Sequence, residues 1–293
     1  MDNSKNTNID FNVRTNTRLN PRLQQGERRN NKNSSFIGEV KSLIYIIILA
    51  LSIRILVFEP FYIPSDSMKK TLINGDYIFS TKYSYGYSRH SFIISTNLFS
   101  GRFLEAPPKR GDVIIFRPPH QMHERYIKRL VGLPGEKIEI KNSIIYINDI
   151  QVQTNIIRTY EENGVIFDEY KETLSNGVSY FTRHIRESEH ASNLDHLYVS
   201  KNSGPFFIPE GHYFFLGDNR DQSGDSRFEL GFVPFENFIS KARFVFFSFG
   251  EPLILDNPLA FEQITQVWKW ISSFKYQRFF LTSLYDTDRP KGS

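Results

Sequence analysis

The sequence of 293 residues contains no cysteine. A part of this chain outside the cytoplasm must therefore be stable without disulfide bonds, although the absence itself fits either side of a membrane. Beyond its first 41 residues, the chain also has no net charge. The first 41 residues carry eight basic and four acidic side chains, whereas the rest of the chain carries 28 of each sign. The body thus gives no sign of a basic surface for nucleic acid.

Residues 1–40 are rich in Asn, Arg, Gln and Ser and show almost no apolar periodicity. This composition predicts a disordered, basic tail, because such a segment cannot bury enough apolar surface to fold. We interpret it as a solvated leader that sets membrane topology. Binding of RNA or anionic lipid by the tail is the alternative.

An apolar segment at residues 41–58 follows the tail. As a helix, its 18 residues would span about 27 Å, slightly less than an average hydrocarbon core of about 30 Å. Arg54 lies near its far end, where a long side chain can reach the headgroups. We predict a transmembrane anchor, with the N-terminus in the cytoplasm and the body outside it. A buried core helix is one alternative; a cleaved signal peptide is disfavoured, because residues 59–62 offer no small-x-small cleavage site.

Beyond the anchor, short β-branched and aromatic runs alternate with turn residues, and long helical periodicity is missing between residues 60 and 255. This pattern predicts an all-β body. We expect a main β domain built from residues 59–150 and 206–255, with 151–205 as a smaller inserted β region.

Two further segments of the body have recognisable patterns. Residues 84–108 contain two glycines and two prolines in an arrangement that suits an extended hairpin. Within residues 256–293 we expect a helix followed by a tail, because apolar side chains recur at helical spacing at Ile264, Val267, Trp268, Ile271 and Phe274. Packing of this helix on the body and contact with a membrane surface are both open.

Three blocks carry candidate chemistry: residues 63–68, 126–132 and 217–227. Ser67 in the first block needs a neighbouring base, since a serine hydroxyl is a weak nucleophile. No histidine falls within the blocks, although a Ser-His-Asp triad assembled in space is an alternative. Lys128 in the second block lies in an apolar strand, where burial would lower its pKa from about 10.4. An ordinary Lys-Arg pair on an edge strand is the other interpretation of Lys128 and Arg129.

These blocks, with a weaker one at residues 110–116, resemble the type I signal peptidases. Members of that family are membrane-anchored Ser/Lys proteases that remove secretory signal peptides, and the resemblance covers roughly residues 40–250. It implies that Ser67 is the nucleophile and Lys128 the general base. The implied partners are signal peptides of exported preproteins and the lipid bilayer, without nucleic acid, cofactor or metal. The implied location is the bacterial inner membrane, with a single pass and the body on the periplasmic side.

The resemblance also implies roles around this pair. Ser65 matches the serine whose hydroxyl assists the backbone amide of Ser67 in the oxyanion hole. Ser223 matches the serine that orients the lysine amine, and Asp225 and Arg227 match a supporting ion pair.

Six further residues match positions that line shallow pockets for small side chains, which gives the family its Ala-x-Ala preference. A substrate bound there as an added strand would be aligned by main-chain hydrogen bonds. The alternative role of these residues is core packing. They are Phe61, Ile63, Pro64, Met68, Tyr126 and Ile127.

Two residues depart from the family pattern: Asp66 replaces a glycine and Lys70 a proline. Asp66 would disturb the backbone angle or place an anion near the oxyanion, so we expect intact but slower catalysis. Metal sites are excluded, because His120 and His123 supply two ligands only and the loop at 219–230 ends in leucine where an EF-hand needs glutamate. The remaining alternatives are a self-cleaving repressor-like Ser/Lys protease and an inactive, anchored β module that binds exported chains.

Overall fold

The computed structural model describes residues 21–91, 101–186, 200–250, 269–281 and 284, with the side chains of 21–35 and 55 left aside. The chain forms two compact units, Met1–Leu51 and Ser52–Ser293. The first holds most of one long helix and the second holds the β body.

Helix α1 (Pro21–Leu56) is 36 residues long and includes an apolar stretch, Phe36–Arg54, with a mean hydropathy of 2.0. This stretch is long enough to cross a membrane, and none of it is buried in the protein. That exposure argues against a buried core helix.

The helix bounds correct two predictions. Residues 21–40 are helical and not disordered, because proline suits a first turn and the Gln, Glu, Arg and Lys residues that follow are good helix formers. The apolar stretch also begins earlier than residue 41, since Phe36, Ile37 and Val40 extend it towards the N-terminus. It does not reach Phe58, which already pairs with Thr81 in a strand.

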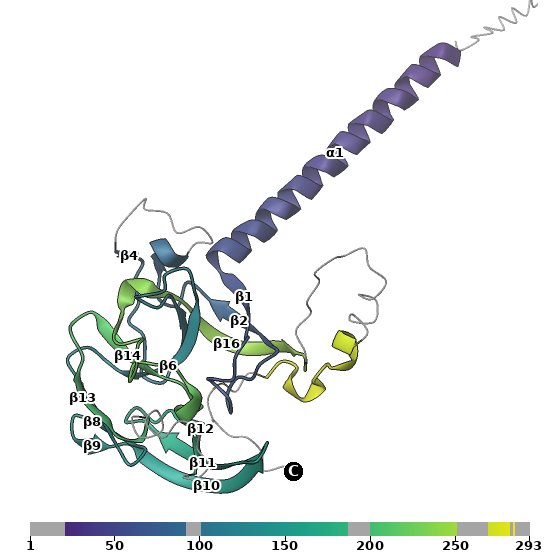
Figure 1. Ribbon diagram of the computed structural model, residues 1–293. Coiled ribbons are helices and arrows are strands. Elements are labelled where there is room, and N and C mark those ends of the chain that lie inside the picture. The colour runs from purple at the N-terminus through teal and green to yellow at the C-terminus, as the bar shows by residue number, and fades with distance from the viewer. Residues whose placement is uncertain (1–20, 92–100, 187–199, 251–268, 282–283, 285–293) are drawn as a thin grey trace, which may run out of the picture. The chain divides into compact units, whose positions relative to one another are not determined.

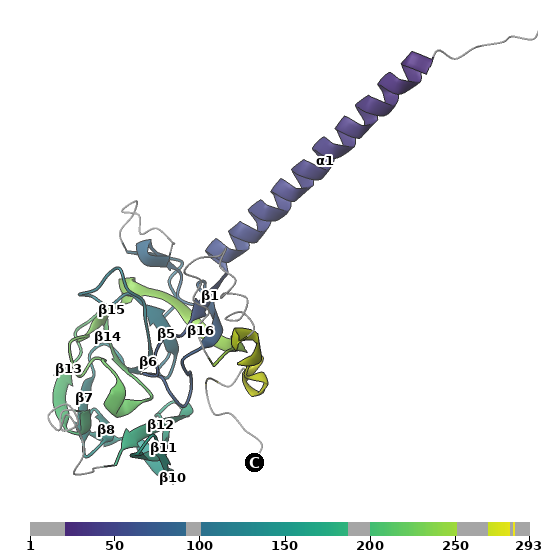
Figure 2. The same cartoon turned by 45° about the vertical axis from the view of Figure 1, so that its right-hand side comes forward.

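The largest sheet of the body has seven strands in the order β1-β2-β16-β5-β6-β14-β15, and every neighbouring pair is antiparallel (Figure 2). Its strands are β1 (Phe58–Tyr62), β2 (Asp76–Thr81), β5 (Val113–Phe116), β6 (Tyr126–Gly132), β14 (His212–Leu216), β15 (Val233–Pro234) and β16 (Phe238–Ser248). Short 3-10 turns occur at η1 (Arg89–Ser91), η2 (Arg220–Gln222), η3 (Phe235–Asn237) and η4 (Tyr276–Arg278).

Three smaller sheets complete the body, and a mostly β fold behind one N-terminal apolar helix is confirmed. One has the order β13-β7-β8-β9, another β10-β11-β12, and β3 pairs with β4 across the predicted hairpin. Strands β10 to β12 lie together at the bottom of Figures 1 and 2. The bounds are β3 (Tyr87–Ser88), β4 (Arg102–Phe103), β7 (Lys137–Lys141), β8 (Ile144–Ile147), β9 (Ile150–Gln151), β10 (Gln153–Glu162), β11 (Val165–Thr173), β12 (Ser179–Ile185) and β13 (Ser203–Phe207).

The expected insertion at 151–205 has different bounds in the structure. Strands β10, β11 and β12 form a sheet of their own, whereas β13 pairs with β7 of the preceding segment. The stretch from residue 151 to 205 therefore serves two sheets.

The C-terminal helix expected within 256–293 ends earlier than its apolar pattern suggested. Residues 251–268, with Ile264, Val267 and Trp268, lie outside the described part of the chain. Residues 269–272 are helical, and the chain then turns so that Phe274 forms a bridge with Phe249. Stacking of Trp270 on Phe249, with ring centres 3.9 Å apart, favours the turn over a continued helix.

Both faces of β5 and β6 are covered by packed side chains. In β5, Val113 and Ile115 belong to one apolar cluster, while Ile114 and Phe116 belong to another. Since successive side chains of a strand point to opposite faces, neither face meets water. Strand β6 is likewise buried from Ile127 onward, so any charged side chain on it is desolvated.

Candidate active site

Ser67 lies in the loop that joins β1 to β2. Two backbone hydrogen bonds close the base of this loop, Ile63 N to Asp76 O at 2.9 Å and Gly75 N to Ile63 O at 3.0 Å. Asn219 holds its tip, donating its backbone N–H to Ser67 O at 3.1 Å and its side-chain amide to the backbone O of Asp66 at 3.0 Å. The first and third sequence blocks therefore meet at this serine.

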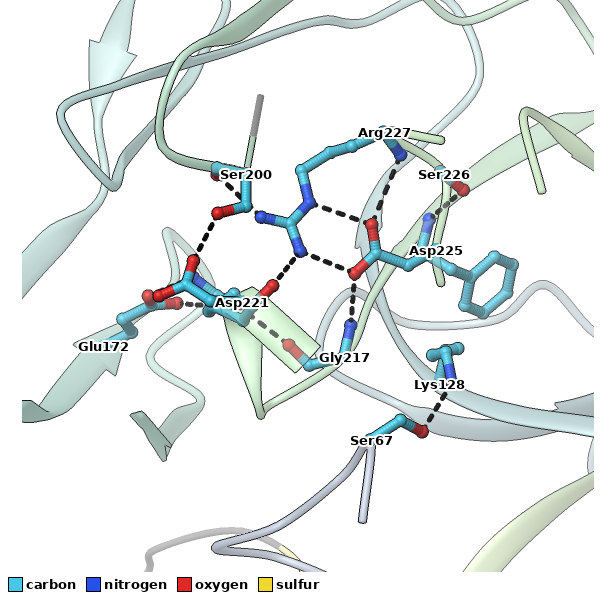
Figure 3. Close-up of polar contacts among 11 residues, drawn as sticks. Ser67, Lys128, Glu172, Ser200, Gly217, Asp221, Asp225, Ser226 and Arg227 are labelled. Carbon is cyan, nitrogen blue, oxygen red and sulfur yellow. Dashed lines mark hydrogen bonds and ion pairs between the residues drawn. The ribbon is translucent and has the colours of Figure 1, made fainter. Parts of the chain in front are cut away.

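Lys128 brings the second block to the same point. It lies in β6, only 5% of its surface is exposed, and its Nζ donates a hydrogen bond to Ser67 Oγ at 2.6 Å (Figure 3). A nucleophile and base within hydrogen-bond reach form a catalytic arrangement. We call Ser67 and Lys128 the dyad.

Burial makes the Lys128 amine a usable base. It lowers the pKa of Lys128 from 10.5 to about 8, although the charges of Asp225 and Asp218 oppose this shift. About a tenth of the amine is therefore neutral at pH 7, whereas a solvated lysine is almost fully protonated there.

Arg129 follows Lys128 in β6 and points to the opposite face. It is fully buried, and its guanidinium donates to the carboxylate of Asp218 at 2.8 and 2.7 Å. The same guanidinium stacks 4.0 Å above the ring of Tyr180. Pairing and hydrogen bonds offset the cost of burying this charge. The Asp218 partner was missed in the sequence, where spacing alone does not connect the two blocks.

Asp225 and Arg227 form the expected ion pair. Arg227 donates Nη2 to Asp225 Oδ2 at 2.8 Å and Nε to Oδ1 at 2.9 Å, and the N–H of Gly217 donates to Oδ2 at 3.0 Å (Figure 3). Burial raises the pKa of Asp225, but Arg227 and Gly217 outweigh it, so the net pKa lies below its ordinary value. Asp225 is thus a fixed anion that acts on Lys128.

The two other serines make weaker contacts. Ser65 Oγ lies 3.5 Å from Ser67 Oγ, at the limit of a hydrogen bond. The hydroxyl of Ser223 is buried and has no hydrogen-bond partner among the described residues. A Cβ at Gly217 would lie 2.2 Å from Ser223 Oγ and 2.5 Å from Ser67 O, so this close packing requires glycine. An orienting bond from Ser223 to Lys128 stays a prediction.

The six predicted substrate-binding residues divide into two groups. Ile63, Met68 and Ile127 are buried members of one core cluster, as the core-packing alternative proposed. Phe61, Pro64 and Tyr126 keep exposed surface, although Phe61 also packs against the same cluster.

Lys69 and Lys70 attach the loop of Ser67 to the sheet of β10 to β12, a connection that the sequence did not reveal. Lys69 pairs with Glu162. Lys70 Nζ lies 2.9 Å from Glu169 and 4.1 Å above the ring of Tyr160. Lys70 has φ of 102°, which a proline ring cannot adopt. The backbone at this position therefore differs from the one that the family's proline would require.

Asp66 is compatible with this loop. Its φ is not positive, so the backbone there does not require the glycine that the family usually has. Its carboxylate accepts the N–H of Asn74 at 3.0 Å and lies 3.5 Å from the amine of Lys69. These contacts hold the anion within the loop, and the expected distortion of the backbone is not observed.

The block 217–227 is also attached to the sheet of β10 to β12. The N–H of Arg183 in β12 donates to Asp218 O at 2.9 Å, and Arg220 forms a buried ion pair with Glu172 of β11. Both anchor points lie in a segment that appeared in the sequence only as a polar insertion.

Comparison with known proteins gives consistent matches. Residues 37–247 match the family model described as signal peptidase, peptidase S26. The chain is 46% identical over 272 residues to the signal peptidase I of Rickettsia massiliae, covering 91% of this chain and all of the relative. For Rickettsia canadensis the identity is 47% over 268 residues, covering 90% and 99%. A crystal structure of a signal peptidase I from Enterococcus faecalis matches at 26% identity over 46% of this chain and 97% of that one, with a TM-score of 0.27, too low for a comparison of folds.

Proposed function

We propose that Ser67 is the nucleophile and Lys128 the general base of this chain, which belongs to the signal peptidase family, peptidase S26, and removes signal peptides. The observation that carries this proposal is the 2.6 Å hydrogen bond from a buried lysine amine to the serine hydroxyl. With lysine as the base, the reacting pair needs no histidine.

The chemistry follows from the neutral amine. Lys128 takes the hydroxyl proton as Ser67 Oγ attacks the carbonyl carbon of the scissile bond, and the carbonyl oxygen becomes an oxyanion. The amide of Ser67 and the hydroxyl of Ser65 are the proposed donors to that oxyanion. Lys128 then protonates the departing amine, which leaves an ester on Ser67. The neutral lysine next takes a proton from water, whose oxygen attacks the ester. As the bond to Ser67 Oγ breaks, Lys128 returns that proton to Oγ, which restores the serine hydroxyl and the neutral amine, and the signal peptide leaves as a carboxylic acid that ionises in solvent.

The packing supports specificity for small side chains before the cut. Ile63, Met68 and Ile127 are held in the core, which leaves little depth beneath the loop for a large substrate side chain. Phe61 and Tyr126 expose surface on which the peptide backbone would lie. An Ala-x-Ala sequence, bound as an added strand, suits such a shallow surface.

The anchor supports action at a membrane surface. Phe36–Arg54 would cross the bacterial inner membrane once, with the basic N-terminus in the cytoplasm and the body on the periplasmic side. Ser67 follows Leu56, where α1 ends, by a chain that spans at most about 40 Å. Substrates that present a cleavage site just beyond an apolar segment, namely preproteins in the bilayer, would reach it.

The test uses the full chain in detergent with a preprotein that carries an Ala-x-Ala site. Wild type should cut at the predicted bond, whereas Ser67→Ala and Lys128→Ala should lose at least about 1,000-fold in kcat/KM. Circular dichroism would verify that both variants are folded. Cleavage by folded Lys128→Ala at the wild-type rate would refute the role of the lysine, and no cleavage by folded wild type would favour a binding module.

A further inference from the structure

A cavity of about 530 Å³ is lined by Tyr126, whose ring lies near the amine of Lys128. One wall consists of Tyr126 and residues 118–121, and the other of Gly224 and residues 228–230. Tyr126 is two residues before Lys128 in β6, and Gly224 follows Ser223. The cavity is thus built from the second and third sequence blocks and the loop that precedes β6.

Tyr126, which lines the cavity, also lies close to the reacting atoms. Lys128 Nζ lies 5.5 Å from the centre of the Tyr126 ring and 2.6 Å from Ser67 Oγ. Of the residues predicted to contact the substrate before the cut, only Tyr126 lines the cavity. Of the others, Ile63, Pro64 and Met68 lie in the loop of Ser67, Phe61 lies in β1, and Ile127 is a core residue of β6.

The direction of the reaction decides which part of the substrate meets this cavity. Lys128 must give its proton to the departing amine, so that nitrogen has to lie next to Nζ. The same nitrogen carries the chain of the mature protein. The first residues after the cut therefore begin next to Lys128 Nζ, which lies 5.5 Å from the centre of the Tyr126 ring that lines the cavity.

We propose that this cavity binds the side chain of one of the first two residues after the scissile bond. The proposal rests on the function proposed above and adds a specificity site on the product side. Such a site would let the enzyme select mature N-termini as well as signal peptides.

The lining predicts which side chains it takes. Most of the surface is apolar, from prolines, aromatic rings and Leu230, and Glu229 is the only acidic or permanently charged side chain among the lining residues. Burial raises the pKa of Tyr126, and the charges of Glu124 and Glu229 raise it further, which indicates a negative potential at the mouth. An apolar side chain should therefore bind well and an acidic one poorly.

One experiment measures this charge preference. Peptides would share one Ala-x-Ala site and carry Asp or the isosteric Asn at the first or second position after the cut. With the full wild-type chain, Asp should lower kcat/KM about tenfold relative to Asn at one of these positions. Glu229→Gln should bring that ratio close to one. Glu161→Gln, which removes an exposed carboxylate from β10, should keep it at the wild-type value.

A second variant fills the cavity. A Cβ on Gly224 meets no heavy atom within 4 Å, so a side chain can begin there without a clash at its first atom. Because Gly224 lines the cavity, a phenylalanine ring at this position would occupy space within it. Wild type should prefer Leu over Ala after the cut several-fold, Gly224→Phe should abolish that preference, and Gly224→Ala should keep it. Equal wild-type rates for all peptides would overturn this inference alone. Failure to cut any Ala-x-Ala peptide would overturn the proposed function as well.

Discussion

A rise in pH across the pKa of Lys128 should increase the activity of the peptidase. The pKa of this buried amine is about 8. Only the neutral amine accepts the Ser67 proton, so kcat/KM should rise about tenfold per pH unit below pH 8 and level off above it.

The size of the effect follows from the lowering of the pKa from 10.5 to about 8. At pH 8 about half of the folded molecules hold a neutral Lys128, against about 0.3% for an amine of ordinary pKa. Burial thus increases the population of active base about 150-fold. The same shift corresponds to about 3 kcal/mol of free energy.

Stability gives an independent measurement of that free energy. Between pH 8 and 10.5 the unfolded state keeps the lysine proton that the folded state has lost, so the free energy of unfolding rises with pH in this window. Below pH 8 the cost of the buried charge is fully present. Lys128→Met has no buried charge, so at pH 7 it should be more stable than wild type. The difference in the free energy of unfolding between the two proteins should fall by about 3 kcal/mol from pH 7 to pH 10.5.

The assay is kcat/KM for one uncharged peptide from pH 6 to 10.5 at constant ionic strength, with urea unfolding of wild type and Lys128→Met at pH 7 and pH 10.5. A midpoint near 10 would mean that Lys128 is solvated during turnover. A midpoint near 6.5 would assign the base to a histidine. Either result would refute the reasoning from burial.

Two further predictions concern the surroundings of the dyad. Ser223→Ala should lower kcat about 100-fold and shift the acid limb of the pH profile if the unpartnered hydroxyl positions Lys128 during turnover; an unchanged profile in steady-state rates would contradict that role. Lys70→Pro should destabilise the body by about 3 kcal/mol in urea unfolding, because φ of 102° is closed to proline, whereas Lys70→Gln should lose less. Equal stability of Lys70→Pro and wild type would contradict the loop conformation.

The sequence predicted those features that local pattern encodes. Short apolar runs between turn residues specify strands, and the apolar alternation around Lys128 specifies a buried amine. The contacts of Lys70 could not be predicted, because Glu169 lies about a hundred residues away and only the pairing of β10 with β11 brings it and Tyr160 to the loop. Pattern also failed where packing overrides propensity, as at Phe274, where aromatic contacts with Phe249 replace a helix.

The adjacency of Lys128 and Arg129 in β6 links correct folding to activity. Lys128 pairs with Ile114 and Arg129 with Val113, and the two side chains face opposite sides of the sheet. A slip of one residue would turn the guanidinium to the face of the sheet that holds Ser67 and the amine to the face that holds Asp218. Arginine holds its proton at every physiological pH, so a slipped molecule would have no base and would bury a cation without its carboxylate. Misregistered chains would thus be unstable as well as inert, so no active misfolded form of the protease would accumulate.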